Sequence, residues 1–320
     1  MIVFGPVPSR RLGHSLGINH IPLKHCTYSC VYCQVGRTTT LETTRRSFFP
    51  LDQIIKEVER KISESTKLAV PIDYLTLVPD GEPTLDIKFR KLIEGLANFG
   101  IPVAVISNAS LVDREEVQDA LLLADWVSMK VDAVIETEWR RINRPHRSLS
   151  LSSVLNGIIE FHRKFHGELV TETMLVSGLN DSDAAIQALS DFLLKLNPNK
   201  SYLSLPIRPP AEKWVKPPAP EILQHILDAM SERVSFLELM FESESSDFIS
   251  TGNIIEDILT TTAVHPLREE ALRNMITHSG EKWMIIDELL DSKRITNINY
   301  RGEKFYLNNL SNLIMGAGGK

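Results

Sequence analysis

The sequence predicts an α/β protein built as a partial (β/α)6 TIM-like barrel of parallel strands, followed by a small C-terminal winged-helix-like domain. Short β-rich runs alternate with helical patterns from about residue 15 to 241, and six such units can be distinguished. A polar stretch without clear periodicity follows at 242–253, and a second compact unit begins at 254. Repeated strand–helix units require right-handed crossovers, and therefore a parallel sheet. Six of them favour a barrel over a flat doubly wound sheet.

Hydrophobic periodicity places the elements of the barrel domain, 1–241. In the helix at 51–65, for example, Ile54, Ile55, Val58 and Ile62 recur at helical spacing. Gly100 is a favourable residue for ending the helix at 87–100. The predicted strands are 15–23, 72–78, 101–107, 126–133, 169–176 and 201–206, and the predicted helices are 51–65, 87–100, 114–124, 150–165, 182–196 and 220–231.

The C-terminal unit, 254–320, is predicted to contain helices at 266–278 and 281–291 and a hairpin at 295–310 that turns at Arg301-Gly302. Helices followed by a hairpin indicate a winged-helix-like domain. Its charges are nearly balanced with a slight acidic excess, which does not favour DNA binding. We therefore expect it to contact a protein or to position a macromolecular substrate.

Composition restricts the class of protein. Of 320 residues, 43% are apolar and 24% are charged, as in ordinary globular proteins. The net charge of −6 excludes a chain that binds nucleic acid through its overall charge. No apolar run of 18 residues indicates a membrane span. The N-terminal segment lacks the pattern of a signal peptide, so we expect a cytoplasmic protein.

The cysteines carry the strongest functional signal. All three lie in HCTYSCVYCQ, with the spacing Cys26-x3-Cys30-x2-Cys33. An odd number so closely spaced argues against a disulfide framework. Three thiolates at this spacing fit three corners of a cubane iron–sulfur cluster and leave one iron open. The alternative is a zinc knuckle with His25 or His20 as the fourth ligand.

The cysteine spacing after a first β-strand resembles the signature of the radical S-adenosylmethionine superfamily. This resemblance implies a [4Fe–4S] cluster on the three cysteines. It also implies that the methionine part of S-adenosylmethionine chelates the open iron, and that reductive cleavage yields a 5′-deoxyadenosyl radical. Tyr32 matches the aromatic residue near the adenine. Gly81-Glu82-Pro83 resembles the GEP motif that helps to hold the methionine ammonium, which needs an acceptor in a partly dry site.

Other candidate site residues follow the strands, whose C-terminal ends form the active face of TIM-like folds. Lys130 and Asp132 alternate around Val131 and so share one face of the strand. Two charges there are costly unless they line a site or form a buried structural ion pair. Arg208 either meets a carboxylate or phosphate, or caps the barrel rim. The predicted metal ligands are Cys26, Cys30 and Cys33; the predicted cofactor-binding residues are Tyr32, Gly81, Glu82, Pro83, Ser107, Asn108, Asp132, Pro206 and Arg208; and the predicted catalytic residues are Lys130 and Asp132.

Longer motifs resemble one branch of this superfamily in particular. GPVPSRRLGHSLGI, DGEPTLD, KVDAV, INRPH, ETMLVSGLND and PIRPPAE are similar to a prokaryotic group related to the wyosine-base-forming tRNA enzymes. The resemblance implies a flavodoxin or ferredoxin as electron donor and a tRNA base, another RNA or a small molecule as substrate. It leaves the reaction type open. The basic segment 139–149 either contacts a phosphate or RNA backbone or is a solvated loop.

A protein of a different class remains as an alternative, namely a winged-helix regulator whose cluster senses redox state. Such a sensor needs the three thiolates but has no need of an ammonium acceptor at Glu82. The GEP motif therefore favours the enzyme.

Overall fold

A computed structural model of the chain describes residues 2–240 and 253–309. Its main sheet has eight strands in the order β1-β2-β5-β6-β7-β8-β9-β10. Seven of them run parallel, and only β1 is antiparallel to its neighbour β2. The strands are β1 (Val3–Ser9), β2 (Gly13–Ile18), β5 (Tyr74–Leu77), β6 (Val103–Ser107), β7 (Trp126–Lys130), β8 (Glu168–Met174), β9 (Lys200–Ser204) and β10 (Leu237–Met240).

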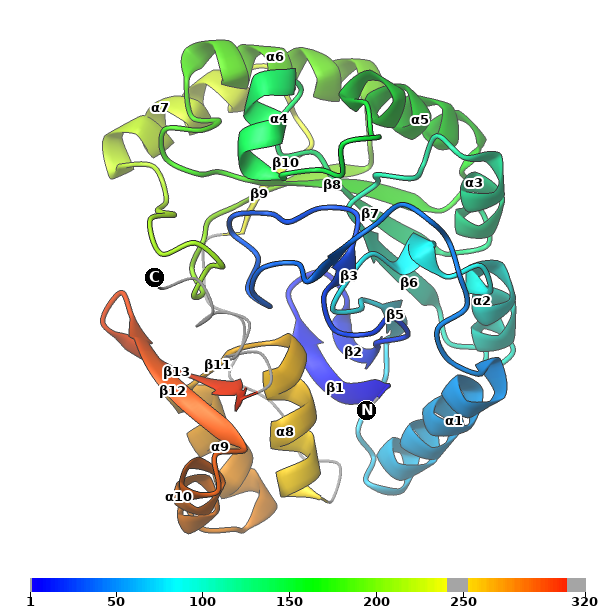
Figure 1. The fold of residues 1–320 in the computed structure, drawn as a ribbon, viewed down its shortest axis with the longest axis vertical. Helices are drawn as coiled ribbons and strands as arrows, with labels where there is room; N and C mark the ends of the chain where they lie inside the picture. Colours follow the sequence, from blue (N-terminus) through cyan, green and yellow to red (C-terminus); the bar gives the residue numbers. More distant parts are fainter. Residues whose placement is uncertain (1, 241–252, 310–320) are drawn as a thin grey trace.

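The helices lie outside the sheet, in an arc that Figure 1 shows around the strands. Since β1 and β10 are the two edges of the sheet and do not pair, the barrel is open between them. The predicted partial barrel with six strand–helix units is therefore confirmed. The helices are α1 (Leu51–Lys67), α2 (Phe89–Ala97), α3 (Glu115–Leu121), α4 (Glu136–Ile142), α5 (Leu151–Lys164), α6 (Asp183–Leu196) and α7 (Pro220–Ser231).

Two strands of the main sheet and one α-helix of the barrel domain were not predicted. Strand β1 contains Pro6 and Pro8, which argue against a strand except at an edge, where β1 lies. Helix α4 covers part of the basic segment expected to be a loop, and its Trp139 is buried against Tyr28, to which its indole N–H donates at 3.3 Å. The strand β10 has only four residues, LELM, which is too short a run to distinguish a strand from a loop.

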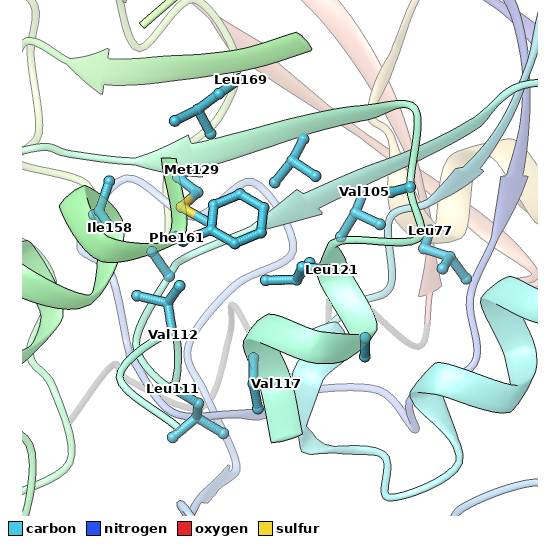
Figure 2. Close-up of a cluster of buried hydrophobic side chains, with 14 of the residues drawn as sticks. Leu77, Val105, Leu111, Val112, Val117, Leu121, Met129, Ile158, Phe161 and Leu169 are labelled. Atoms are coloured by element: carbon cyan, nitrogen blue, oxygen red, sulfur yellow. The ribbon is translucent and has the colours of Figure 1, made fainter. Parts of the chain in front are cut away.

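The core lies between the sheet and the helices (Figure 2). Leu77, Val105, Met129 and Leu169 come from four neighbouring strands and are fully buried. Val117 and Leu121 of α3 and Ile158 and Phe161 of α5 pack in the same cluster. Removal of this apolar surface from water stabilises the barrel. It also holds the strand ends, from which the candidate site residues project, in fixed relative positions.

The C-terminal unit has its own core around Ile258, Leu272 and Tyr306. The hairpin turns at Arg301 and Gly302, which both have positive φ, as predicted. Residues 266–268 are not helical, because Leu267–Arg268 pair with the hairpin instead. The assignment to the winged-helix class remains a prediction. The elements are α8 (Ile254–Val264), β11 (Leu267–Arg268), α9 (Glu269–Ser279), α10 (Met284–Asp291), β12 (Ile295–Tyr300) and β13 (Glu303–Asn308), with the sheet order β11-β13-β12.

Helix α8 was not predicted, because Thr260, Thr261 and Thr262 lower its intrinsic helix propensity. It also provides the main contact with the barrel. Asp257 forms a buried ion pair with Lys61 of α1, at 3.3 Å between Nζ and Oδ1. Tyr300 donates a hydrogen bond to the carbonyl oxygen of Pro206 at 2.9 Å. Most of the predicted linker, 242–252, and the C-terminal residues 310–320 lie outside the described residues.

Candidate functional site

The three cysteines lie in one loop beside the ends of the first barrel strands. Cys26 ends β3 (His25–Cys26), which pairs with β4 (Thr40–Leu41), and Cys30 and Cys33 follow in the loop. All three are free thiols with intermediate exposure. The backbone N–H of Val31 donates to the carbonyl oxygen of Ile142 at 2.9 Å, which ties the loop to the end of α4.

The GEP turn presses directly against this loop. A Cβ atom on Gly81 would lie 1.8 Å from the carbonyl oxygen of His25, so only glycine fits at this position. The next backbone N–H, that of Glu82, donates to the same oxygen at 3.2 Å. The predicted GEP motif and the cysteine loop are therefore adjacent in space.

Each cysteine sulfur accepts one N–H hydrogen bond from a different segment. Asn108 donates to Cys26 and Asn143 to Cys30, each at 3.5 Å from Nδ2 to Sγ. Lys24 donates to Cys33 at 3.2 Å. Hydrogen bonds to the sulfurs are a means by which proteins stabilise iron–sulfur clusters and adjust their potentials. The donor set therefore fits the implied cluster.

The ionisation of the cysteine thiols and of Lys24 depends on burial and on nearby charges. Burial raises the pKa of Cys26 to about 11 and raises that of Cys30 as well. Burial acts to lower the pKa of Lys24, but the three thiol groups outweigh it, and the pKa stands above its ordinary value. The Cys26 and Cys30 thiols thus favour the neutral form until a cation neutralises their charge, as a bound metal does.

The two histidines considered for a zinc knuckle have other roles. His20 is fully buried and hydrogen-bonded to the carbonyl oxygen of Pro83 at 3.1 Å, and burial lowers its pKa to about 4. His25 Nδ1 lies 3.0 Å from the carboxylate of Glu42. In residues 2–240 and 253–309, no three His, Cys, Asp or Glu side chains are arranged to hold a single metal ion.

Glu82 is buried and accepts hydrogen bonds through both carboxylate oxygens. Oε1 accepts from the backbone N–H and the hydroxyl of Thr84 and from the hydroxyl of Ser107, and Oε2 accepts from the backbone N–H of Asn108. The carboxylate thus joins the GEP turn to the residues that follow β6. Asn108 in turn donates to Cys26, so Glu82 is connected to the cysteine loop through Asn108.

Asp132 joins the predicted adenine-side residue Tyr32 to Asn143 after α4 and to Met174 at the end of the neighbouring strand β8. Its carboxylate accepts from the Tyr32 hydroxyl, from Asn143 Nδ2 at 2.6 Å and from the backbone N–H of Met174 at 2.8 Å. Burial raises the pKa of Asp132. Asn143 contacts both Asp132 and Cys30, which places Asp132 one residue away from the cluster loop.

Lys130 pairs with Glu172 rather than with Asp132. Its ammonium donates to Glu172 at 2.7 Å and lies 5.4 Å from the centre of the Tyr32 ring. Arg11 donates to the other carboxylate oxygen. Burial opposes ionisation of Glu172, but Lys130 and Arg11 outweigh it and lower its pKa. The two predicted catalytic residues therefore flank Tyr32 without a direct bond between them.

The residues after β9 meet the loop beyond Cys33. Arg208 donates to the side-chain oxygen of Gln34 at 2.7 Å. Pro206, predicted to bind cofactor, uses its carbonyl oxygen to accept the bond from Tyr300. Glu212 pairs with Arg37 at 2.8 Å and with Arg144 of the basic segment.

A cavity of about 170 Å³ lies beside these groups, inside the open barrel. Its lining includes Gln34 and Val35 of the cysteine loop, which connect it to the candidate cluster. The other lining residues are Phe4, Val7, Pro8, Ser9, Arg11, Leu12, Ser15, Thr76, Val78, Pro79, Asp80, Ile106, Arg208 and His265.

Sequence reasoning missed three residues of this site. Lys24 stands two positions before Cys26, where an adjacent buried charge could have been suspected. Asp80 precedes Gly81 within the motif DGEPTLD, from which only Gly81, Glu82 and Pro83 were predicted as site residues. Asn143 gave no signal, because only the fold brings it to Cys30 and Asp132.

The fold and the site together define an α/β-barrel enzyme. Residues 21–189, more than half of the chain, match the Radical SAM superfamily. The chain belongs to this superfamily, and its cofactors are S-adenosylmethionine and an iron–sulfur cluster.

One relative and two solved structures illustrate what the chain is similar to. The chain is 46% identical over 311 residues to UPF0026 protein MJ1312 of Methanocaldococcus jannaschii, covering 97% of this chain and 96% of the relative. A radical SAM methyltransferase from Sphaerobacter thermophilus has a similar fold, with a TM-score of 0.54 and 14% identity over 71% of this chain and 66% of that protein. Archaeal TYW1 is also similar, with a TM-score of 0.47 and 14% identity over 72% and 75% of the chains.

The comparisons give no support to the redox-sensing regulator considered from the sequence. Across the described part of the chain, the helices are too short or too polar to cross a lipid bilayer.

Proposed function

We propose that Cys26, Cys30 and Cys33 hold the cluster, and that the protein uses it to cleave S-adenosylmethionine reductively. The bond from a separate N–H donor to each of the three sulfurs carries this proposal. When bound, the cluster and S-adenosylmethionine supply a 5′-deoxyadenosyl radical. A reduced flavodoxin or ferredoxin supplies the electron.

The chain's own residues organise the site. Tyr32, fixed by its bond to Asp132, offers a ring for the adenine. Glu82 fixes Ser107 and Asn108, so that these two residues and the GEP turn form one side of the cofactor site. The carbonyl oxygens of the turn and the remaining lone pair of Glu82 are the acceptors that we assign to the methionine ammonium. Lys130 and Asp132 act beside Tyr32 as the groups nearest to the reaction.

Anaerobic reconstitution with iron and sulfide tests the ligand assignment. We expect about four irons per chain in the wild type and, after reduction with dithionite, a low-temperature electron paramagnetic resonance signal that changes on addition of S-adenosylmethionine. Cys26→Ala, Cys30→Ala and Cys33→Ala should each lose the brown chromophore or yield a labile cluster. A full iron complement in any of these variants would contradict the assignment.

We further propose an RNA substrate, since an exposed basic and aromatic surface lies beside the cysteine loop. Arg37 and Arg144 both bind Glu212, yet remain about half exposed, and Trp214 follows close by with 49% exposure. Arginines suit phosphates, and an exposed indole offers a stacking surface for an unpaired base. Trp139, the aromatic residue of the basic segment 139–149, is buried and does not contribute.

Binding of a fluorescent tRNA measured as a function of salt tests this substrate class. The variant Arg37→Ala/Arg144→Ala should weaken binding and reduce the salt dependence by about one to two ionic contacts. Trp214→Ala should weaken binding with an unchanged salt dependence. Arg90→Ala, which removes an exposed arginine on α2, is the matched control. Equal tRNA binding by the wild type and all three variants would exclude this surface as the RNA-binding site.

A further inference from the structure

Arg11 lies in the turn between β1 and β2, and its side chain extends into the barrel. The guanidinium donates to Glu172 of β8 and lies 5.9 Å from the centre of the Trp126 ring on β7 and 6.0 Å from that of the Tyr202 ring on β9. Trp126 and Tyr202 belong to a cluster separate from the core that packs against the helices. Glu172 is the register partner of Tyr202 and therefore shares its face of the sheet. The guanidinium thus lies on the inner side of the barrel.

Arg11 shares its carboxylate with a second cation. Lys130 donates to Glu172 Oε1 at 2.7 Å, and Arg11 donates to Oε2. Asp132 is a further carboxylate whose charge interacts with Lys130, so the anions of this group lie on the Lys130 side of it. Within residues 2–240 and 253–309, the guanidinium of Arg11 donates no other hydrogen bond, although a guanidinium carries several N–H groups. It therefore has donors left for a ligand.

The side chain of Arg11 also reaches the cavity of about 170 Å³. It lines this cavity and keeps 16% of its side-chain surface exposed. The three residues against which its guanidinium packs, Glu172, Trp126 and Tyr202, do not line the cavity. Arg11 therefore stands between the shared carboxylate and the open space, and its exposed surface is accessible from the cavity.

The wall of the cavity carries more cations than carboxylates. Among the described residues that line it, Arg11 and Arg208 are the arginines and Asp80 is the one carboxylate. Asp80 is held by Asn19, whose Nδ2 donates to it at 2.6 Å. A cleft whose walls carry one sign of charge in excess attracts a ligand of the opposite sign. The composition of the wall therefore favours an anion.

We propose that the cavity binds an oxyanion, a carboxylate or a phosphate group, on the guanidinium of Arg11, with Arg208 as a second cation in the wall. A planar guanidinium matches two oxygens of either group. The anion is a ligand distinct from S-adenosylmethionine. This inference goes beyond the proposed function, because the site requires neither the cluster nor the exposed surface assigned to RNA.

Protection of Arg11 from 2,3-butanedione, a small reagent that modifies guanidinium groups, tests the proposal in the wild type. The cluster-bearing protein is treated without reductant, at constant ionic strength, with and without acetate or inorganic phosphate. Peptide mass spectrometry follows Arg11 and, as a control, the exposed Arg90. We expect one of the two anions to slow modification of Arg11 several-fold and to leave Arg90 unaffected.

Two results of this experiment would overturn the proposal. An Arg11 that does not react even without an anion is not accessible from the cavity. An Arg11 that reacts equally fast with and without both anions does not bind them there. Protection by acetate alone identifies a carboxylate site, and protection by phosphate alone identifies a phosphate site.

Direct binding of the same probes to variants gives a second test. Acetate is followed by saturation-transfer nuclear magnetic resonance and phosphate by the width of its phosphorus resonance. Arg11→Gln, which removes the charge, should bind the protecting anion at least about tenfold more weakly than the wild type. Arg11→Lys, which keeps the charge but not the planar fork, should lie between them, and Arg90→Gln should match the wild type. Equal affinity in the wild type and Arg11→Gln would contradict a site on Arg11.

Competition separates this ligand from the cofactor, which carries a carboxylate of its own. We expect the protecting anion to bind the cluster-bearing wild type equally well with and without S-adenosylmethionine. Displacement by S-adenosylmethionine would assign Arg11 to the cofactor and overturn the proposal. Arg11-dependent anion binding in a protein unable to cleave S-adenosylmethionine would refute the proposed function alone. Cleavage with anion binding that does not depend on Arg11 would refute only this inference.

Discussion

The ammonium of Lys24 lies 3.2 Å from the sulfur of Cys33, although the side chain is only 3% exposed. A buried cation is costly unless an anion lies beside it. The three cysteines of the loop raise the pKa of Lys24, and the Asp80 carboxylate is a further group with which its charge interacts. The position of Lys24 therefore fits a loop that carries negative charge in the working protein.

Lys24→Met should lower the midpoint potential of the cluster. The reduced form carries one more negative charge, so loss of the neighbouring cation disfavours it. A tenfold change in the equilibrium constant for reduction corresponds to about 59 mV for one electron, and we expect the midpoint potential to shift by tens of millivolts. An anaerobic redox titration measures it, with Lys24→Arg as the charge-conserving control. An intact cluster with unchanged potential in Lys24→Met would show that the ammonium has no such role.

Glu82→Gln should weaken S-adenosylmethionine binding and also lower stability. The new N–H2 group must face one of the donors that the carboxylate now accepts, at a cost of about 1–3 kcal/mol. Iron content should stay near that of the wild type, because Glu82 is not a metal ligand. Equilibrium dialysis and thermal unfolding measure the two effects. Glu94→Gln, in an exposed pair with Arg90, provides the control. Unchanged affinity would place the GEP turn outside the cofactor site.

The sequence predicted the barrel well because each strand and helix has a local pattern. The apolar run from Leu92 to Leu96, for instance, is visible without the fold, although the helix ends at Ala97 and not at the predicted Gly100. The cysteine loop and the GEP turn were likewise contiguous motifs. Contacts between distant segments were not predictable. Lys130 pairs with Glu172, 42 positions away, rather than with Asp132, and no local pattern encodes that choice.

The junction between the two parts of the chain was the least predictable feature. Polar residues at 242–253 indicated a linker, yet Asp257 of α8 is buried against Lys61. An isolated Lys or Asp in a sequence is usually exposed, so no sequence pattern predicted that Lys61 and Asp257 form a buried ion pair. The division into domains at these boundaries stays a prediction.

Asp257→Ala should destabilise the protein by about 3–5 kcal/mol, because it leaves the Lys61 ammonium buried without this partner. The double variant Lys61→Met/Asp257→Leu should recover most of that loss, since apolar residues of similar size can replace a buried pair. Urea unfolding measures both. The surface variant Glu256→Ala, on the same helix, is the control. If Asp257→Ala costs no more than Glu256→Ala, α8 is not held to the barrel by this pair.

Alkylation of the metal-free protein should depend steeply on pH at Cys26. The thiolate is the reactive form, and burial raises the pKa to about 11 from the ordinary 9.0. The rate of reaction of Cys26 with iodoacetamide should thus rise about tenfold per pH unit up to about pH 11. Peptide mass spectrometry resolves the site. A rate that levels off near pH 9 would show that burial does not suppress the thiolate.

The same shift has a consequence for stability. Since the folded form binds the Cys26 proton more tightly, this contribution is fully present below pH 9 and is lost as the pH rises toward 11. Between pH 8 and pH 11, the free energy of unfolding of the metal-free wild type should therefore decrease more than that of the metal-free Cys26→Ala variant.

Formation of 5′-deoxyadenosine is the most direct measurement of the central claim. The reconstituted protein is incubated anaerobically with S-adenosylmethionine and dithionite, and the product is quantified by mass spectrometry. We predict that the wild type forms 5′-deoxyadenosine and that the variant lacking Cys26, Cys30 and Cys33 forms none. The assay is run with dithionite and, separately, with reduced flavodoxin as the electron donor. The account would be contradicted if the wild type held a full cluster and bound S-adenosylmethionine, but formed no more 5′-deoxyadenosine than the triple variant with either donor.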